Sequence, residues 1–170
     1  LNKRAQEGWR KRVEPVCSAI QQRSTPDDAL FVWGFRPDLY TWCQRRPASR
    51  YVYTTFVAGF VPWQDKMTKA REDALAVPGS RSQLLQELEA TRPPVLIDAA
   101  KSLAGRSISR YERLAEYVAR HYCHGGTRSG LDVLLRRRPD GSCPPALAPE
   151  KSTPVTPAPM ESLPNSAPSE

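Results

Sequence analysis

Apolar residues recur along the chain at two different spacings, and the alternation between them predicts helices and strands in turn. Residues 3–23 repeat apolar side chains at three- and four-residue steps, which is typical of a helix with one buried face. Pro15 lies inside this segment and is expected to begin a second helical piece. Residues 29–33, ALFVW, form a continuous apolar run, which is typical of a strand buried on both faces.

Four more segments have the character of helices that pack one face against a core. Pro37 suits the first turn of a helix over DLYTWCQR, which is expected to end before Arg46-Pro47. Residues 64–76 predict a helix that ends before Pro78-Gly79.

Capping-box patterns mark the other two helices. Ser80 with Gln83 predicts a helix that runs to about Thr91, and Ser109 with Glu112 predicts a helix over SRYERLAEYVARHY.

Two further strands and a terminal hairpin complete the pattern. Residues 50–56, RYVYTTF, are rich in β-branched and aromatic side chains and predict a second strand. Residues 95–100, VLIDAA, predict a third strand. Residues 123–138, CHGGTRSGLDVLLRRR, predict a hairpin or a single strand with its glycines in the turning part.

This order of elements predicts an α/β fold, with a small, mostly parallel sheet, flanking helices and a last strand that runs antiparallel at the edge. Residues 1–138 form the expected folded domain. Residues 139–170 hold nine of the 17 prolines, with Ser, Thr and Ala filling most of the rest. Because such a segment has little apolar surface to bury, a disordered tail is expected there.

Charge and cysteine content narrow the function classes. The formal charge is +7, and the tail carries one lysine against four acidic residues, so the positive charge is concentrated in residues 1–138. No run of about 18 apolar residues occurs, so no segment is expected to span a membrane. The four cysteines lie far apart without a CxxC pair, so no zinc site is expected. Their number permits disulfides but does not require them, so the cysteines alone do not distinguish an oxidising from a reducing compartment.

The carboxyl end of the first strand is the expected place for a site, because ligands of open α/β sheets bind beyond such ends. Neither GxGxxG nor GxxxxGK[ST] occurs, so no cofactor is expected. Arginine forks match phosphate or sugar-phosphate oxygens, and Arg36, Arg45, Arg46 and Arg50 cluster after this strand. The alternative is a solvated basic edge that pairs with nearby aspartates such as Asp38.

The remaining polar candidates favour structural roles. Asp98 ends the third strand and is expected to cap a turn rather than act as a base. His121 lies on the apolar face of its helix, and His124 lies in a turn. No spacing of acids or nucleophiles predicts a catalytic residue. The basic run at 136–138 lacks interleaved aromatic residues, so nucleic-acid binding is not expected.

The order of five sequence blocks carries more information than any block alone. The blocks are FVWGFRPDLY, RRPASRYVYTTF, RPPVLIDAA, YERLAEYVARHY and a terminal LLRRR. This series resembles the soluble C-terminal domain that follows the transmembrane bundle in bacterial GT-C membrane glycosyltransferases, relatives of dolichyl-phosphate-mannose protein mannosyltransferases and of aminoarabinose transferases. The resemblance covers about residues 10–138 and is most specific at Gly34–Tyr40 and Arg46–Tyr51.

The resemblance implies an accessory domain on the extracytoplasmic (periplasmic) face of the bacterial inner membrane. Such enzymes use polyprenyl-phosphate sugars, and their catalytic acid lies between membrane helices, so this chain is not expected to catalyse transfer alone. The implied partners are the transmembrane bundle of the same enzyme, the lipid-linked donor and the anionic membrane surface. Arg36, Tyr40, Arg46 and Arg50 become the substrate-facing candidates.

An extracytoplasmic position also makes the cysteines candidates for disulfides. Cys123 and Cys143 flank the terminal hairpin and are the first candidate pair. Two rival functions stay open at this point: a stand-alone interaction module, and a small soluble α/β protein that binds a nucleotide or a sugar phosphate.

Overall fold

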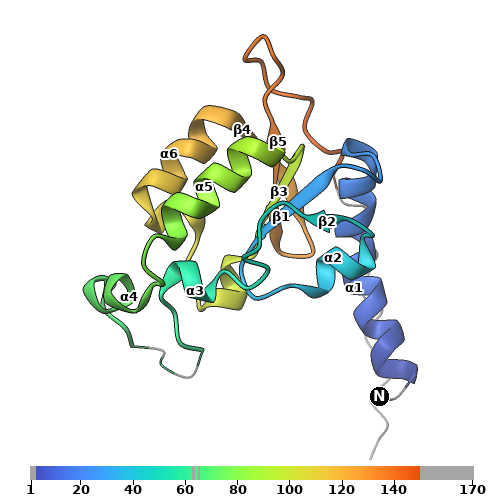
Figure 1. Cartoon of the computed structure of the whole chain (residues 1–170). Helices are drawn as coiled ribbons and strands as arrows, with labels where there is room; N and C mark the ends of the chain where they lie inside the picture. The colour runs from blue at the N-terminus through green and yellow to red at the C-terminus, as the bar shows by residue number, and fades with distance from the viewer. Residues whose placement is uncertain (1–2, 63, 65, 150–170) are drawn as a thin grey trace, which may run out of the picture.

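The computed structural model describes residues 3–62, 64 and 66–149, and these form a five-stranded sheet with helices on both faces (Figure 1). The strand order is β2-β1-β3-β5-β4, with β1 parallel to β2 and β3, and β5 antiparallel to β3 and β4. The predicted α/β fold is therefore confirmed, including the antiparallel end of the sheet. The strands are β1 Ala29–Trp33, β2 Arg46–Pro47, β3 Val95–Asp98, β4 Tyr122–Arg128 and β5 Leu131–Arg136.

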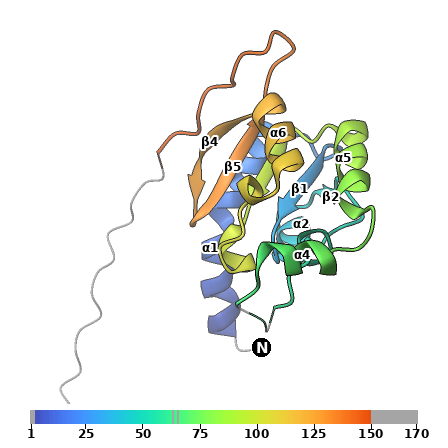
Figure 2. The ribbon, with the colours of Figure 1, turned by 90° about the vertical axis from the view of Figure 1, so that its left-hand side faces the viewer.

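Helices cover the sheet in two layers. In Figure 1 the sheet lies between α5 and α6 on the left and α1 and α2 on the right, and Figure 2 shows the β4–β5 hairpin at the edge away from β2. The α-helices are α1 Lys3–Arg23, α2 Asp38–Trp42, α3 Thr55–Ala58, α4 Lys69–Leu75, α5 Ser80–Thr91 and α6 Glu112–His121, and the 3₁₀ helices are η1 Ala100–Leu103 and η2 Ile108–Arg110. None of the helices in the described part of the chain combines the length and apolar character needed to cross a membrane.

The alternation of side chains along β1 divides the core in two. Leu30 and Val32 face α1 and α2, whereas Phe31 and Trp33 face α5 and α6. All five residues of β1 are buried, as its continuous apolar sequence predicts.

Pro15 does not divide the first helix. The prediction of a second helical piece is wrong, because α1 runs from Lys3 to Arg23 with Pro15 inside it. An interior proline costs about 3 kcal/mol. The buried face of α1 packs on the sheet, and a Cys17–Cys43 disulfide joins α1 to the end of α2. Tertiary packing therefore overrides the local preference.

The segment 50–56 is not a strand. The place beside β1 is taken by Arg46–Pro47, and the Ala48 N–H donates to the Leu30 carbonyl at 2.8 Å. The chain then turns away across the end of the sheet, where Thr54 Oγ1 accepts from the Gly34 N–H at 2.7 Å. β-Propensity predicts a half-buried extended segment here, but the hydrogen-bonding edge is already occupied.

The predicted helices are present, but their boundaries and caps differ. α2 and α4 are shorter than expected. At α5 the N-cap is Gly79, and Gln83 instead accepts from the Tyr51 hydroxyl at 2.6 Å. At α6 the N-cap is Tyr111, and Ser109 shares a hydrogen bond with Ser107. Both capping-box predictions are wrong, although the helices that they marked exist.

The chain ends in the predicted hairpin. Ser129 and Gly130, with φ values of 50° and 75°, make its turn, whereas Gly125 and Gly126 lie within β4. The Cys123–Cys143 disulfide is confirmed. Residues 139–149, which the sequence places in the tail, continue alongside the hairpin, and the Leu147 N–H donates to the Gly125 carbonyl at 2.8 Å. The rest of the expected disordered tail, residues 150–170, lies outside the described residues.

Candidate functional site

The carboxyl ends of β1 and β3 meet at one end of the sheet, where η1, η2, α3 and α4 gather at the bottom of Figure 1. This is the end at which an open α/β sheet offers room for a ligand. Three features lie there: a buried ion cluster, a basic cleft and an exposed apolar face.

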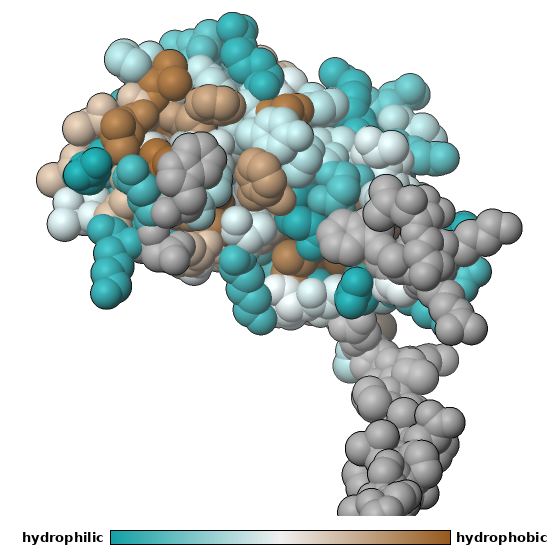
Figure 3. Space-filling view, turned by 90° about the horizontal axis from the view of Figure 1, so that it is seen from below, coloured by the Kyte–Doolittle hydropathy of each residue, from teal (hydrophilic) through white to brown (hydrophobic). Residues whose placement is uncertain are grey.

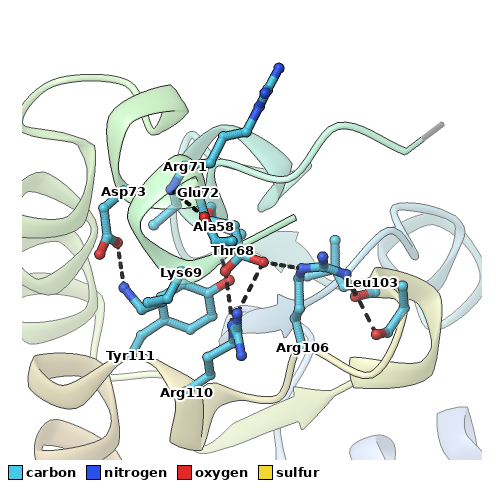
Figure 4. Close-up of polar contacts among 12 residues, drawn as sticks. Ala58, Thr68, Lys69, Arg71, Glu72, Asp73, Leu103, Arg106, Arg110 and Tyr111 are labelled. Atoms are coloured by element: carbon cyan, nitrogen blue, oxygen red, sulfur yellow. Dashed lines mark hydrogen bonds and ion pairs between the residues drawn. The ribbon is translucent and has the colours of Figure 1, made fainter. Parts of the chain in front are cut away.

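The buried ion cluster consists of Glu72, Arg106 and Arg110. Glu72 is fully buried; its Oε1 accepts from Arg106 Nε at 2.6 Å, and its Oε2 accepts from Arg110 Nε at 2.8 Å (Figure 4). Arg106 is also buried, and its guanidinium lies 4.2 Å from the centre of the Phe60 ring. The cluster ties α4 to the segment between η1 and α6.

The backbone explains why Glu72 is held in this position. Gly59 ends α3 with a φ of 69°, and a Cβ at this residue would lie 1.7 Å from the Glu72 carbonyl oxygen. Only glycine permits this approach of α3 to α4. The Glu72 side chain therefore points inward from a helix that is otherwise polar.

Two guanidinium groups face one carboxylate in this cluster. Burial raises the pKa of Glu72, but hydrogen bonds from Arg110 and Arg106 outweigh it, so that the pKa lies below its ordinary value. The hydrogen bond to Glu72 raises the pKa of Arg110. Glu72 is therefore ionised at neutral pH, and the cluster keeps an excess positive charge.

The basic cleft lies between α4, α5 and the start of α6 and has a volume of about 390 Å³. Its apolar floor includes Trp33, Leu84 and Leu114. Its polar rim is made by Lys69, Asp73, Arg81, Arg110, Tyr111, Glu112 and Arg113.

The rim of the cleft is ordered by an aromatic ring and a carboxylate. Arg81 Nη1 lies 2.6 Å from Asp73 Oδ1. Lys69 donates to the same oxygen (Figure 4). Lys69 Nζ and Arg81 Cζ lie 5.5 Å and 5.2 Å from the centre of the Tyr111 ring. Hydrogen bonds from Lys69 and Arg81 lower the pKa of Asp73, and burial raises the pKa of Tyr111 to about 12. At neutral pH Asp73 is therefore charged and Tyr111 is protonated.

Five large apolar side chains at this end are exposed, and we call them together the exposed apolar face: Phe35, Tyr53, Phe56, Leu75 and Val77. The Phe35 and Tyr53 rings are 5.0 Å apart, and the Val77 N–H donates to the Phe56 carbonyl at 2.9 Å. Figure 3, which views this end from below, shows apolar atoms at the surface with long hydrophilic side chains around them. Trp42, the other large exposed hydrophobic residue in the described part of the chain, lines a separate groove beside α1.

The predicted substrate-facing residues do not converge. Arg36 forms a two-point ion pair with Asp38, with both bonds at 2.9 Å, at the end of β1. Tyr40 is buried, and its hydroxyl accepts from the Val32 N–H at 3.1 Å; burial raises its pKa to about 12. Both residues shape the strand–turn–helix segment.

The other predicted arginines lie along the β2 edge. Arg45 is buried and bonds to Ser24, whereas Arg46 is exposed and donates to the Asp27 carbonyl at 3.0 Å. Arg50 is paired with Glu87 of α5. The structure thus keeps these arginines apart from Arg36.

The other polar candidates have structural partners. Asp98 Oδ2 accepts from the Ile108 N–H at 3.0 Å, in keeping with the expected turn role, and burial raises its pKa. The His121 ring lies beside the Tyr117 ring, tilted by 46° with ring centres 4.7 Å apart, and burial lowers the pKa of His121. His124 is exposed in β4 near Asp132. Arg136 donates to the Tyr117 and Tyr122 hydroxyls at 3.4 Å.

Sequence reasoning missed the buried ion cluster and the basic cleft. Glu72 lies in a polar segment, KAREDAL, and nothing in its spacing marks it as buried. Arg106 and Arg110 are four residues apart, but Arg106 lies outside any helix, so this spacing does not predict that the two side chains share a partner. Within residues 3–149, leaving out 63 and 65, no three His, Cys, Asp or Glu side chains gather so that they could hold a metal ion. No protein-family model matches the chain, and comparisons with curated proteins and with solved structures find no match either.

Proposed function

We propose that these residues form an extracytoplasmic accessory domain of a membrane glycosyltransferase that uses a polyprenyl-phosphate sugar as donor. In this role the domain does not catalyse transfer. It covers the acceptor side of an active site in the transmembrane bundle of the same enzyme, with the carboxyl ends of β1 and β3 towards the membrane.

The observation that carries the proposal is the exposed apolar face. Of the large hydrophobic residues that are exposed in the described part of the chain, all but Trp42 lie at one end of the sheet. Arg71 and Lys101 are exposed at the same end, on α4 and η1. Grouped apolar side chains mark interaction surfaces, and aromatic rings bordered by cations suit the boundary between a membrane and water.

The block with the most specific resemblance to these enzymes contributes Phe35 to this face. Gly34 has a φ of 138°, and a Cβ there would lie 2.6 Å from Ser102 Oγ. The Phe35 N–H donates to the same Ser102 oxygen at 2.7 Å, which leaves the ring exposed at the end of the sheet. Arg36 and Asp38 then fix the turn into α2. In this proposal Arg36 and Tyr40 hold the turn, and Phe35 makes the contact.

Two disulfides also support an extracytoplasmic position. All four cysteines are paired, and disulfides persist mainly in oxidising compartments.

Polar substitution of the apolar face is expected to lower sugar transfer in the enzyme that contains this domain. For Phe35→Ser combined with Phe56→Ser we expect transfer to fall at least tenfold, because fully burying even one large apolar side chain contributes about 1.5–3 kcal/mol. The melting temperature is expected to stay near that of the parent, since both rings are exposed. A radiolabelled lipid-linked sugar measures transfer.

The matched control is Trp42→Ser, which removes a similarly exposed ring from a different surface. It is expected to leave transfer unchanged. Equal losses for the two variants, or a coding sequence that holds no membrane-spanning segments upstream of Leu1, would contradict the proposal. The second result would favour a stand-alone interaction module.

A further inference from the structure

We infer that the basic cleft between α4, α5 and α6 binds a phosphate group, as a monoester or a diester. This inference is separate from the proposed function, because every residue that lines the cleft belongs to the described part of this chain and no transmembrane bundle is needed to form it. Its volume of about 390 Å³ lies in the range of small-molecule sites, and its apolar floor leaves room for a short organic substituent.

The charges on the rim favour an anion. Four cationic side chains line the cleft against two carboxylates; the cations are Lys69, Arg81, Arg110 and Arg113, and the carboxylates are Asp73 and Glu112. Glu72 beneath the cleft is shared between Arg106 and Arg110, so it does not cancel the excess. Side-chain exposure of 40% for Lys69 and 37% for Arg110 lets a ligand reach them.

The arginines are held in place before a ligand arrives. Glu72 fixes Arg110 through Nε and Nη2, and Arg110 Nη1 has no hydrogen bond to the part of the chain that the structure describes. Arg81 Nε donates to the Val57 carbonyl at 3.1 Å, and its guanidinium lies against Tyr111. Holding guanidinium groups in one geometry lowers the entropy cost of binding an oxyanion.

Asp73 occupies the position of such an anion. Its Oδ1 accepts from Lys69 and from Arg81, while Arg81 Nη2 is buried without an acceptor among the described residues. A planar carboxylate serves only part of this donor set, whereas the tetrahedral oxygens of a phosphate accept from several directions. Asp73 is 42% exposed, so an incoming phosphate can displace it.

The test is a titration of the 170-residue chain with inorganic phosphate and with glycerol 3-phosphate at low salt, followed by NMR. Arg81→Gln is expected to weaken binding about tenfold, the effect of one charge-assisted hydrogen bond. Asp73→Asn is expected to strengthen phosphate binding about threefold, because the substitution removes the carboxylate that competes with the phosphate. This magnitude corresponds to the usual contribution of a surface ion pair. Arg120→Gln, on the far part of α6, is the control and should change nothing.

A second arm separates the sources of the phosphate. The chain is mixed with phosphatidylcholine vesicles that do or do not contain phosphatidylglycerol. Vesicle binding that requires Arg81, without binding of the soluble esters, assigns the cleft to a lipid headgroup; the reverse assigns it to a soluble phosphate compound. Binding in neither arm, or equal losses for Arg81→Gln and Arg120→Gln, overturns the inference. Neither arm measures sugar transfer, so failure of phosphate binding is distinguishable from failure of the proposed function.

Discussion

Replacing Glu72 with glutamine is expected to lower the free energy of unfolding by about 3–5 kcal/mol, the usual cost of breaking a buried ion pair from one side. Glu72 is fully buried, and the Arg106 side chain is only 8% exposed. Without the carboxylate, Arg106 keeps a buried charge that no other acidic group in the cluster compensates. Urea unfolding at neutral pH measures the loss.

Asp73→Asn is the matched control, because it alters the next residue of the same helix. Its ion pairs are exposed, so a loss below about 1 kcal/mol is expected.

The pH dependence gives a second check. Because the folded-state pKa of Glu72 lies below its ordinary value, its contribution is present above about pH 4 and is lost as the pH falls through the lowered pKa. Equal losses for the two variants, or a difference between Glu72→Gln and the parent that does not shrink in acid, would contradict this account.

Removal of the Cys17–Cys43 disulfide is expected to be the second large effect. The bond closes a sequence separation of 26 residues, for which loop entropy alone gives about 3.5 kcal/mol. Both cysteines are buried between α1 and the sheet, so alanine at both positions also leaves unfilled space in the core. Chemical unfolding of the Cys17→Ala/Cys43→Ala variant measures the sum.

The second disulfide provides the comparison. Cys123–Cys143 closes a separation of 20 residues, so loop entropy predicts nearly the same loss. Cys143 is exposed, however, and its removal leaves no core cavity. We therefore expect the smaller loss for Cys123→Ala/Cys143→Ala. A larger loss for this pair would contradict the expectation that the Cys17–Cys43 variant loses core packing in addition to loop entropy.

Burial on both faces explains which strands could be predicted. β1 and β3 are continuous apolar runs because helices cover both sides of the sheet, and this pattern is visible in a single sequence. Residues 50–56 have an equally clear strand composition, but whether they form a strand depends on which segment pairs with the free edge of β1. Arg46–Pro47 pairs with this edge, and no local sequence pattern predicts which of the two segments does so.

The site was harder to predict than the fold, for a related reason. The sequence correctly placed Gly34 and Arg36 at a strand end, because their order after ALFVW is local information. The buried ion cluster joins Glu72 to arginines more than 30 residues away. A glutamate in a polar helix is normally solvated, so its burial follows from the close approach at Gly59 and could not be read from the segment itself.

The most direct test of the central claim is photocrosslinking from the exposed apolar face in the membrane enzyme to which we propose that this domain belongs. A photoreactive phenylalanine analogue replaces Phe56 in one variant and Trp42 in the other, which compares two exposed rings on different surfaces. We expect crosslinks to lipid or to the transmembrane bundle from position 56 and none from position 42. Crosslinks from position 42 alone, or from neither position, would contradict the claim that the carboxyl ends of β1 and β3 face the membrane.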